Sequence, residues 1–175
     1  TVTILSSNLA SGATMGEWGL SALVTVDGRC ILFDAGRHPD TVLRNAAVLQ
    51  ADLSCVTDVV LSHFHFDHTT GLPPIIDAAR AHNPDAIRRV HVAQGFFLSR
   101  RVTGGADTER NQMIAMRETL AAVDVEFVVH DRSTEILPGV WVSGPINRRH
   151  PERNYPSTTE VRLDGAWVED HVPES

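Results

Sequence analysis

The sequence predicts a layered α/β domain in which helices cover a mixed β-sheet. Short β-rich runs alternate with helical stretches along the 175 residues, an order that is typical of α/β folds. The step Asp27-Gly28 joins two β-rich runs, and such a step is a strong hairpin signal because both turn residues need a positive φ. The hydrophobic fraction of 42% is that of an ordinary core, and neither an internal repeat nor a linker divides the chain. Residues 1–175 are therefore expected to form one domain.

Each element follows from a local pattern. Residues 1–7 alternate apolar and polar side chains as in a first strand, and residues 8–16 are rich in Ser, Gly and Asn as in a loop. Pro39 suits the first turn of a helix, and apolar residues recur behind it at helical spacing as far as Leu49. Further helices are expected at residues 73–82 and 112–122. Further strands are expected at residues 20–26, 30–33, 56–61, 90–93, 125–129, 135–137 and 140–143, with a last hairpin at residues 161–168.

Charge and composition exclude several classes of function. The 15 basic residues are all Arg and face 22 acidic residues, which gives a net charge of −7. We therefore expect neither nucleic acid nor an anionic membrane as a partner, and a small-molecule substrate is the default. The lack of Lys excludes a Walker A phosphate loop and Schiff-base chemistry.

Localisation signals are weak. No apolar run approaches the ~20 residues that a membrane helix needs, and no basic stretch precedes an apolar one at the start, so a cytoplasmic location is expected. A leader that has been removed stays open, because the sequence starts at Thr1 without Met. Cys30 and Cys55 lie in apolar surroundings and are expected to be buried free thiols.

The densest chemical signal is the run HFHFDH at residues 63–68, directly after an apolar strand. In an extended segment residues i and i+2 point the same way, so His63 and His65 can converge on one ion. A turn at Asp67 and His68 would present a carboxylate and a third imidazole to a neighbouring ion. Imidazole with carboxylate suits Zn²⁺, with Mn or Fe as alternatives. The spacing favours a metal site over a solvated His-rich loop.

This run resembles the HxHxDH signature of the metallo-β-lactamase-fold hydrolases. ILFDAG at residues 31–36 is similar to the strand and Asp-x-Gly turn of that family. EWGLS at residues 17–21 and VSGPINR at residues 142–148 resemble a branch that includes pterin synthases related to methanopterin assembly. The resemblance implies an αββα sandwich of two αβ halves, of which this chain looks like the N-terminal half, a mixed sheet flanked by helices.

The resemblance also implies roles for the ligand residues. His63 and His65 would bind a first zinc ion, and Asp67 and His68 would belong to a second. The two ions would share a hydroxide that is nucleophilic near neutral pH. Asp67 would orient this hydroxide and take or pass its proton, which makes Asp67 the candidate catalytic residue.

Three further residues are candidates for supporting roles. Asp34 matches the aspartate of the family that fixes the tautomer and orientation of a ligand imidazole, and an ordinary strand-ending Asp with turn duties is the alternative. Arg148 and Arg149 could hold a phosphate or carboxylate of the substrate. A solvated polar loop is the alternative for these two arginines.

The remaining ligands of the family come from its second half, and the branch places its third His in a Gly-Cys-x-His-like run that this sequence lacks. The domain is therefore expected to lack its C-terminal half, with the site completed by further sequence, a second chain or a dimer. Substitute ligands within the chain would be His91, His130, His150 or His171.

Three functions follow from these observations. The first is a dinuclear zinc hydrolase that uses a metal-bound hydroxide to attack an ester, amide, lactone or phosphoester. The second is a condensing synthase-like enzyme for pterin and ribosyl-aminobenzene phosphate substrates. The third is a non-catalytic metal-binding half-domain that needs a partner chain.

Overall fold

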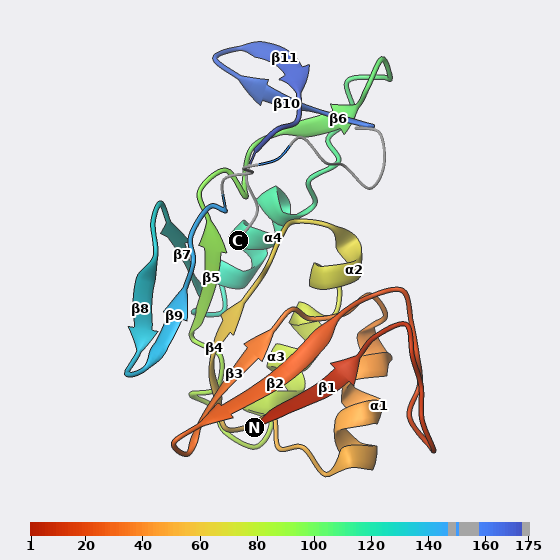
Figure 1. The fold of residues 1–175 in the computed structure, drawn as a ribbon, viewed down its shortest axis with the longest axis vertical. Helices are drawn as coiled ribbons and strands as arrows, with labels where there is room; N and C mark the ends of the chain where they lie inside the picture. Colours follow the sequence, from red (N-terminus) through yellow and green to blue (C-terminus); the bar gives the residue numbers. More distant parts are fainter. Residues whose placement is uncertain (147–149, 151–157, 173–175) are drawn as a thin grey trace.

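The computed structural model describes residues 1–146, 150 and 158–172, and its fold is the mixed α/β arrangement that the sequence predicts (Figure 1). The strands are β1 (Val2–Ser6), β2 (Ser21–Val26), β3 (Arg29–Phe33), β4 (Val56–Val60), β5 (Arg89–Ala93), β6 (Arg100–Val102), β7 (Glu126–His130), β8 (Thr134–Leu137), β9 (Val140–Val142), β10 (Thr159–Leu163) and β11 (Ala166–Glu169). The helices are α1 (Pro39–Leu49), α2 (Phe66–Thr69), α3 (Leu72–Arg80) and α4 (Met113–Ala121).

The main sheet has six strands in the order β1-β2-β3-β4-β5-β7. Strands β1, β2 and β3 pair antiparallel, whereas β3, β4, β5 and β7 pair parallel. Asp27 and Gly28 adopt φ values of 47° and 76° between β2 and β3, which confirms the predicted tight hairpin. Because parallel strands end at the same edge, the loops that follow β3 and β4 emerge side by side, and open parallel sheets bind ligands at this edge.

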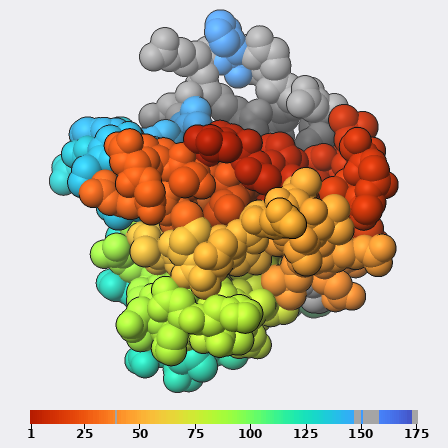
Figure 2. Space-filling view, turned by 90° about the horizontal axis from the view of Figure 1, so that it is seen from below, coloured from red at the N-terminus to blue at the C-terminus, as the bar shows by residue number. Residues whose placement is uncertain are grey.

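Helices α1, α3 and α4 lie behind the main sheet in Figure 1. Figure 2 shows the same layering from below, with β1 to β3 in red and orange on one side and the α3 region in light green on the other. Val42 of α1, Ile75 of α3 and Met113 of α4 are fully buried against residues such as Leu32 and Val59 of the sheet. None of the helices in the described ranges combines the length and apolar character that crossing a bilayer requires.

Two small sheets complete the described structure. Strands β8 and β9 form the predicted hairpin, and β11, β10 and β6 form a three-stranded sheet at one end of the molecule (Figure 1). Strand β6 is not among the predicted strands, because its residues Arg-Arg-Val show no apolar alternation. This strand forms through pairing with β10 from 59 residues further along, in the register Arg101 to Glu160, so its formation depends on tertiary contact.

The prediction of free thiols was wrong. Cys30 and Cys55 form a disulfide, with their Cα atoms 5.5 Å apart. Cys30 lies opposite Val56 in the parallel pairing of β3 with β4, so the residue before Val56 comes next to Cys30. The separation of 25 residues in sequence concealed this proximity, since it depends on which strands are neighbours.

Candidate metal centre

The four predicted ligand residues lie in the segment that leaves the carboxyl end of β4. The chain bends at residues 62 and 64. His65, which precedes the helical turn of α2, is extended, with φ −63° and ψ 146°. Asp67 and His68 lie within that turn, and the Thr69 hydroxyl donates to the carbonyl of His65 at 3.0 Å. The sequence pattern showed neither helix nor strand here. The single helical turn supplies the change of direction that was expected at Asp67 and His68.

The structure brings the four side chains together. His63 Nε2 lies 3.0 Å from His65 Nδ1, and His68 Nε2 lies 3.6 Å from the Asp67 carboxylate. His63, Asp67 and His68 each offer one ligand atom within 4.8 Å of the others. Imidazole nitrogens and a carboxylate at this spacing fit the donor set of zinc. The rings of His63 and His68 also lie close, with centroids 4.2 Å apart, so the predicted ligands form one cluster rather than two separate pairs. His65 contacts His63 but is not one of the three residues whose ligand atoms converge.

The electrostatics of the cluster keep His63 neutral. Burial lowers its pKa to about 3, with further contributions from the neighbouring His68 and His65 and from Arg100. A metal ion binds the neutral imidazole, so protons do not compete for this nitrogen at neutral pH. The Ser62 hydroxyl lies 2.9 Å from His63 Nδ1 and fixes the ring from its other side.

Asp34 directly follows β3 and contacts the metal loop through Ser62 and His68. Its side chain is fully buried, and its carboxylate accepts the backbone N–H and the hydroxyl of Ser62, each at 2.8 Å. The other contact is His68 Nδ1 at 2.7 Å. A carboxylate there favours the tautomer with the proton on Nδ1, which presents Nε2 on the side of Asp67. This geometry fits the orienting role rather than that of a turn residue alone.

The exit of the metal loop also packs closely against the turn after β3. A Cβ atom on Gly71 would lie 1.9 Å from the carbonyl oxygen of Ala35. Gly71 donates its N–H to the carbonyl of Gly36 at 3.3 Å, and Ala35 donates to the carbonyl of His68 at 2.7 Å. The glycine of the HTTG stretch is thus required by the contact between the two loops.

Arg100 of β6 connects the three-stranded sheet to the metal loop. Its side chain is buried, and its guanidinium lies 4.1 Å from the ring centroid of Phe64, between His63 and His65 in the sequence. Its Nε donates to Asp170 at 2.7 Å, and its terminal nitrogens donate to the backbone carbonyls of residues 95, 96 and 98. The strand β6 that sequence reasoning missed therefore carries a residue in contact with the site.

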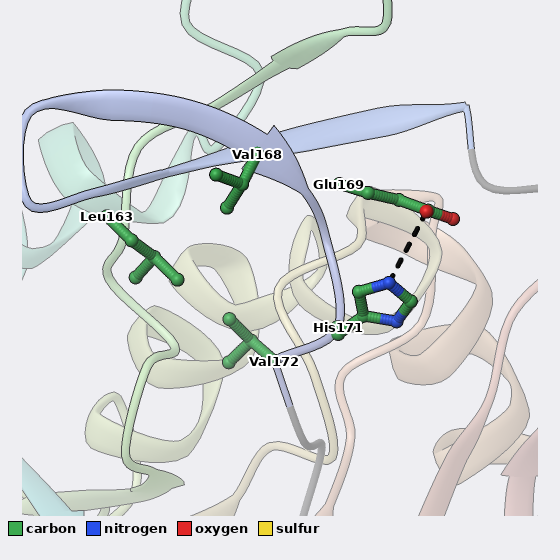
Figure 3. A pocket seen from close by; sticks show the side chains of 5 residues that line it. All are labelled: Leu163, Val168, Glu169, His171 and Val172. Carbon is green, nitrogen blue, oxygen red and sulfur yellow. Dashed lines mark ion pairs between the residues drawn. The ribbon is translucent and has the colours of Figure 1, made fainter.

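A surface pocket of about 520 Å³ lies against the β10–β11 hairpin (Figure 3). Its walls are the aliphatic side chains of Leu163, Val168 and Val172, with Glu169 and His171 beside them. His171 Nε2 forms an ion-pair contact with Glu169 at 3.4 Å. The candidate ligand His171 therefore lies beside this pocket and does not belong to the group formed by His63, Asp67 and His68.

The other candidate ligands also occupy defined places. His91 Nε2 lies 2.9 Å from the buried carboxylate of Asp58, and His91 Nδ1 lies 2.9 Å from His130 Nε2. Both histidines are buried in the main sheet, as members of a network with Asp58. His150 is exposed. Arg148 and Arg149 lie outside the described residues.

The Asp58 network predicts a specific pH dependence of stability. Burial opposes its ionisation, but hydrogen bonds from His91 and Arg89 hold the pKa of Asp58 well below its ordinary value. The stabilisation is therefore present above about pH 4 and lost as the pH falls below it. We expect Asp58→Asn to lower the free energy of unfolding at pH 7 by about 3 kcal/mol.

Urea unfolding between pH 3 and pH 7 measures this effect. The variant should lose less stability than the parent below about pH 4, because the group that takes up the proton is gone. The pKa of His130 is lowered by burial and by His91, so both proteins should share a loss that begins below about pH 6.5. Parallel curves for the two proteins below pH 4 would rule out Asp58 as the source.

The sequence of the chain is similar to that of known proteins. Residues 19–98 match the family model of the Metallo-beta-lactamase superfamily. Ribonuclease Z of Thermobifida fusca (strain YX) is 34% identical over 109 residues, which cover 59% of this chain and 33% of that protein. The 7,8-dihydropterin-6-methyl-4-(beta-D-ribofuranosyl)-aminobenzene-5'-phosphate synthase of Methanocaldococcus jannaschii is 38% identical over 60 residues, which cover 32% of this chain and 20% of the synthase.

The fold has a counterpart among solved structures. Tm1679, described as a metal-dependent hydrolase of the beta-lactamase superfamily, aligns with a TM-score of 0.68 at 23% identity. The alignment covers 99% of this chain and 58% of Tm1679. The chain thus spans a third or less of the two sequence relatives and little more than half of the structural one. The family resemblance drawn from the HFHFDH run is confirmed.

Proposed function

Because the chain belongs to the metallo-β-lactamase superfamily, we propose that it is a metal-dependent hydrolase of a small ester, amide, lactone or phosphoester. The observation that carries the proposal is the convergence of His63, Asp67 and His68, with ligand atoms within 4.8 Å of one another. The buried Asp34 carboxylate holds His68 in the tautomer that a metal ligand needs. Superfamily membership supports hydrolase chemistry in general, and the cluster supports its location.

The proposed cofactor is zinc, as two ions, with Mn or Fe as alternatives. Zinc bound here would lower the pKa of water to ~7 and polarise the carbonyl or phosphoryl group of the substrate. His63 and His68 would hold the metal together with Asp67. His65, whose Nδ1 lies 3.0 Å from His63 Nε2, is a further candidate ligand. Asp67 would share in binding and accept the proton of the attacking water, as the carboxylate of the group that it forms with His63 and His68. Asp34 would keep His68 in place.

Further ligands are proposed to come from outside the cluster. Among the described residues, His63, Asp67 and His68 form the group able to hold a metal, and dinuclear chemistry needs more donors. We assign these to residues beyond the described ranges or to a second chain that completes the site. A non-catalytic metal-binding role, with a partner chain required for activity, is the outcome if no hydrolysis accompanies metal binding.

A second candidate activity is that of a condensing synthase. The support is the 38% identity over 60 residues to the pterin-related synthase of Methanocaldococcus jannaschii. Binding of a phosphorylated ribosyl aromatic compound by the purified protein would favour this candidate. The relative named ribonuclease Z raises RNA as a substrate, but the net charge of −7 opposes binding of a polyanion, and we retain a small-molecule substrate.

The test is a hydrolysis panel with a chromogenic ester, a lactone, an amide and a phosphodiester. We expect turnover of at least one class, loss of that turnover on treatment with a chelator, and recovery with added Zn²⁺, Mn²⁺ or Fe²⁺. The metal that restores the highest rate identifies the working cofactor. Hydrolysis that survives chelation unchanged would contradict the proposal.

A further inference from the structure

The EWGLS segment has a structural role that its sequence alone does not reveal. Glu17 is buried, with 9% of its surface exposed, although it lies in the loop that leads into β2. Its carboxylate accepts the backbone N–H groups of Arg37 at 3.0 Å and of His38 at 2.8 Å, and the hydroxyl of Ser6. A buried carboxylate that receives several hydrogen bonds stays charged and holds its donors firmly.

The two backbone donors, Arg37 and His38, belong to the loop that carries Asp34. His38 precedes the first residue of α1 and offers no side-chain cap, so the Glu17 carboxylate supplies negative charge at the positive end of that helix. Burial opposes ionisation of Glu17, but the hydrogen bonds from Ser6, Arg37 and His38 lower its pKa overall. A Cβ atom on Gly36 would lie 2.5 Å from Glu17 Oε1, so the carboxylate fills the bend of this loop.

The same segment also touches the metal loop directly. The N–H of Leu20 donates to the carbonyl of Asp67 at 3.3 Å, and the N–H of Gly36 donates to the carbonyl of Leu20 at 2.9 Å. A Cβ atom on Gly19 would lie 2.7 Å from the carbonyl oxygen of Asp67. The hydroxyl of Ser21 donates to the carbonyl of Asp34 at 2.8 Å. EWGLS is thus in contact with both loops that form the cluster.

We propose that Glu17 is a positioning residue of the metal centre, which acts by holding the loop of residues 34–38 so that Asp34 orients His68. The role rests on the proposed metal-dependent function. Glu17 itself contacts no ligand atom. Its effect passes through the backbone of Arg37 and His38 to the Asp34 carboxylate, and from there to His68 Nδ1.

The test measures zinc affinity by competition with a chromophoric chelator, together with the absorption spectrum of the Co²⁺-substituted protein. Glu17→Gln keeps the shape of the side chain and removes its charge, and we expect zinc affinity to fall by roughly 10- to 100-fold. The Co²⁺ bands should change at the same time, because the coordination geometry changes. Ser6→Ala removes one donor to Glu17 and should give a smaller loss, which provides a milder variant if Glu17→Gln does not fold.

Two controls separate positioning from general loss of stability. Asp52→Asn removes a carboxylate that accepts a backbone N–H and a hydroxyl of Ser54 at the opposite end of β4, and its zinc affinity should equal that of the parent. In an Asp34→Asn background, Glu17→Gln should add little, because residues that act through one another give non-additive effects.

The outcomes distinguish this role from the function on which it rests. Unchanged zinc affinity in Glu17→Gln, or losses that simply add in the double variant, would overturn the positioning role while leaving the metal centre intact. Failure of the unchanged protein to bind zinc would overturn the metal centre and this role with it.

Discussion

Replacement of Asp67 by alanine is expected to reduce the rate of the proposed metal-dependent hydrolysis by about 10²- to 10⁴-fold, the range of a lost acid–base group. Asp67 contributes the carboxylate of the cluster with His63 and His68. Its removal would leave imidazoles alone, lower the metal affinity and take away the proposed proton acceptor of the attacking water. The side chain is half-buried and lies in a short surface helix, so the free energy of unfolding should change by less than about 1 kcal/mol.

The measurement is kcat/KM on the substrate class that the hydrolysis panel identifies, as a function of the added metal concentration. Asp77→Ala is the matched control, since Asp77 is an exposed carboxylate on α3, and its activity should match that of the parent. Addition of excess zinc should restore only the part of the loss that comes from weaker binding. Full activity of the Asp67 variant would remove this residue from the reaction.

Asp34→Asn is expected to weaken zinc binding by roughly 10- to 100-fold and to lower the free energy of unfolding by about 1–3 kcal/mol. The backbone of Asp34 has φ 56°, a conformation that Asn adopts readily. The backbone conformation of the loop should therefore be unchanged in the variant. An amide offers one acceptor atom where the carboxylate offers two. Either Ser62 or His68 would then face an N–H group instead of an oxygen.

Zinc affinity and urea unfolding of the same preparations test this prediction. Asp27→Asn is the control, because Asp27 has a similar φ of 47° but lies in the exposed turn between β2 and β3. This variant should leave both quantities unchanged within error. Equal zinc affinity in Asp34→Asn and Asp27→Asn would assign Asp34 to the turn alone.

The elements predicted most securely were those whose signals are local. The Asp27-Gly28 hairpin, the helix after Pro39 and the strand before His63 depend on neighbouring residues, and all three are confirmed. The order of strands in the main sheet, in contrast, is set by tertiary packing. The Cys30–Cys55 disulfide follows from that order, and sequence separation alone could not show it.

The residues of the candidate site also differ in whether a local sequence signal reveals them. The HFHFDH run could be recognised because its four ligand-type residues are adjacent in sequence. The contacts of Glu17 and Arg100 with the loops of the site could not be recognised, because their partners at residues 37–38, 64 and 170 come from other parts of the chain. To recognise these two residues, one would have to know that their charged side chains are buried against the loops of the site. The sequence carries no sign of it beyond the resemblance of EWGLS to one branch of the family.

The most direct test of the central claim, that residues 63–68 form a metal centre, is the zinc content per chain. Elemental analysis of freshly purified protein of verified mass, before and after equilibration with Zn²⁺, gives this number, with His63→Ala as the reference. We predict two ions per chain in the parent when the site is complete, and a loss of zinc in the variant. Metal at the level of the buffer in the parent, with no uptake on equilibration, would contradict the account.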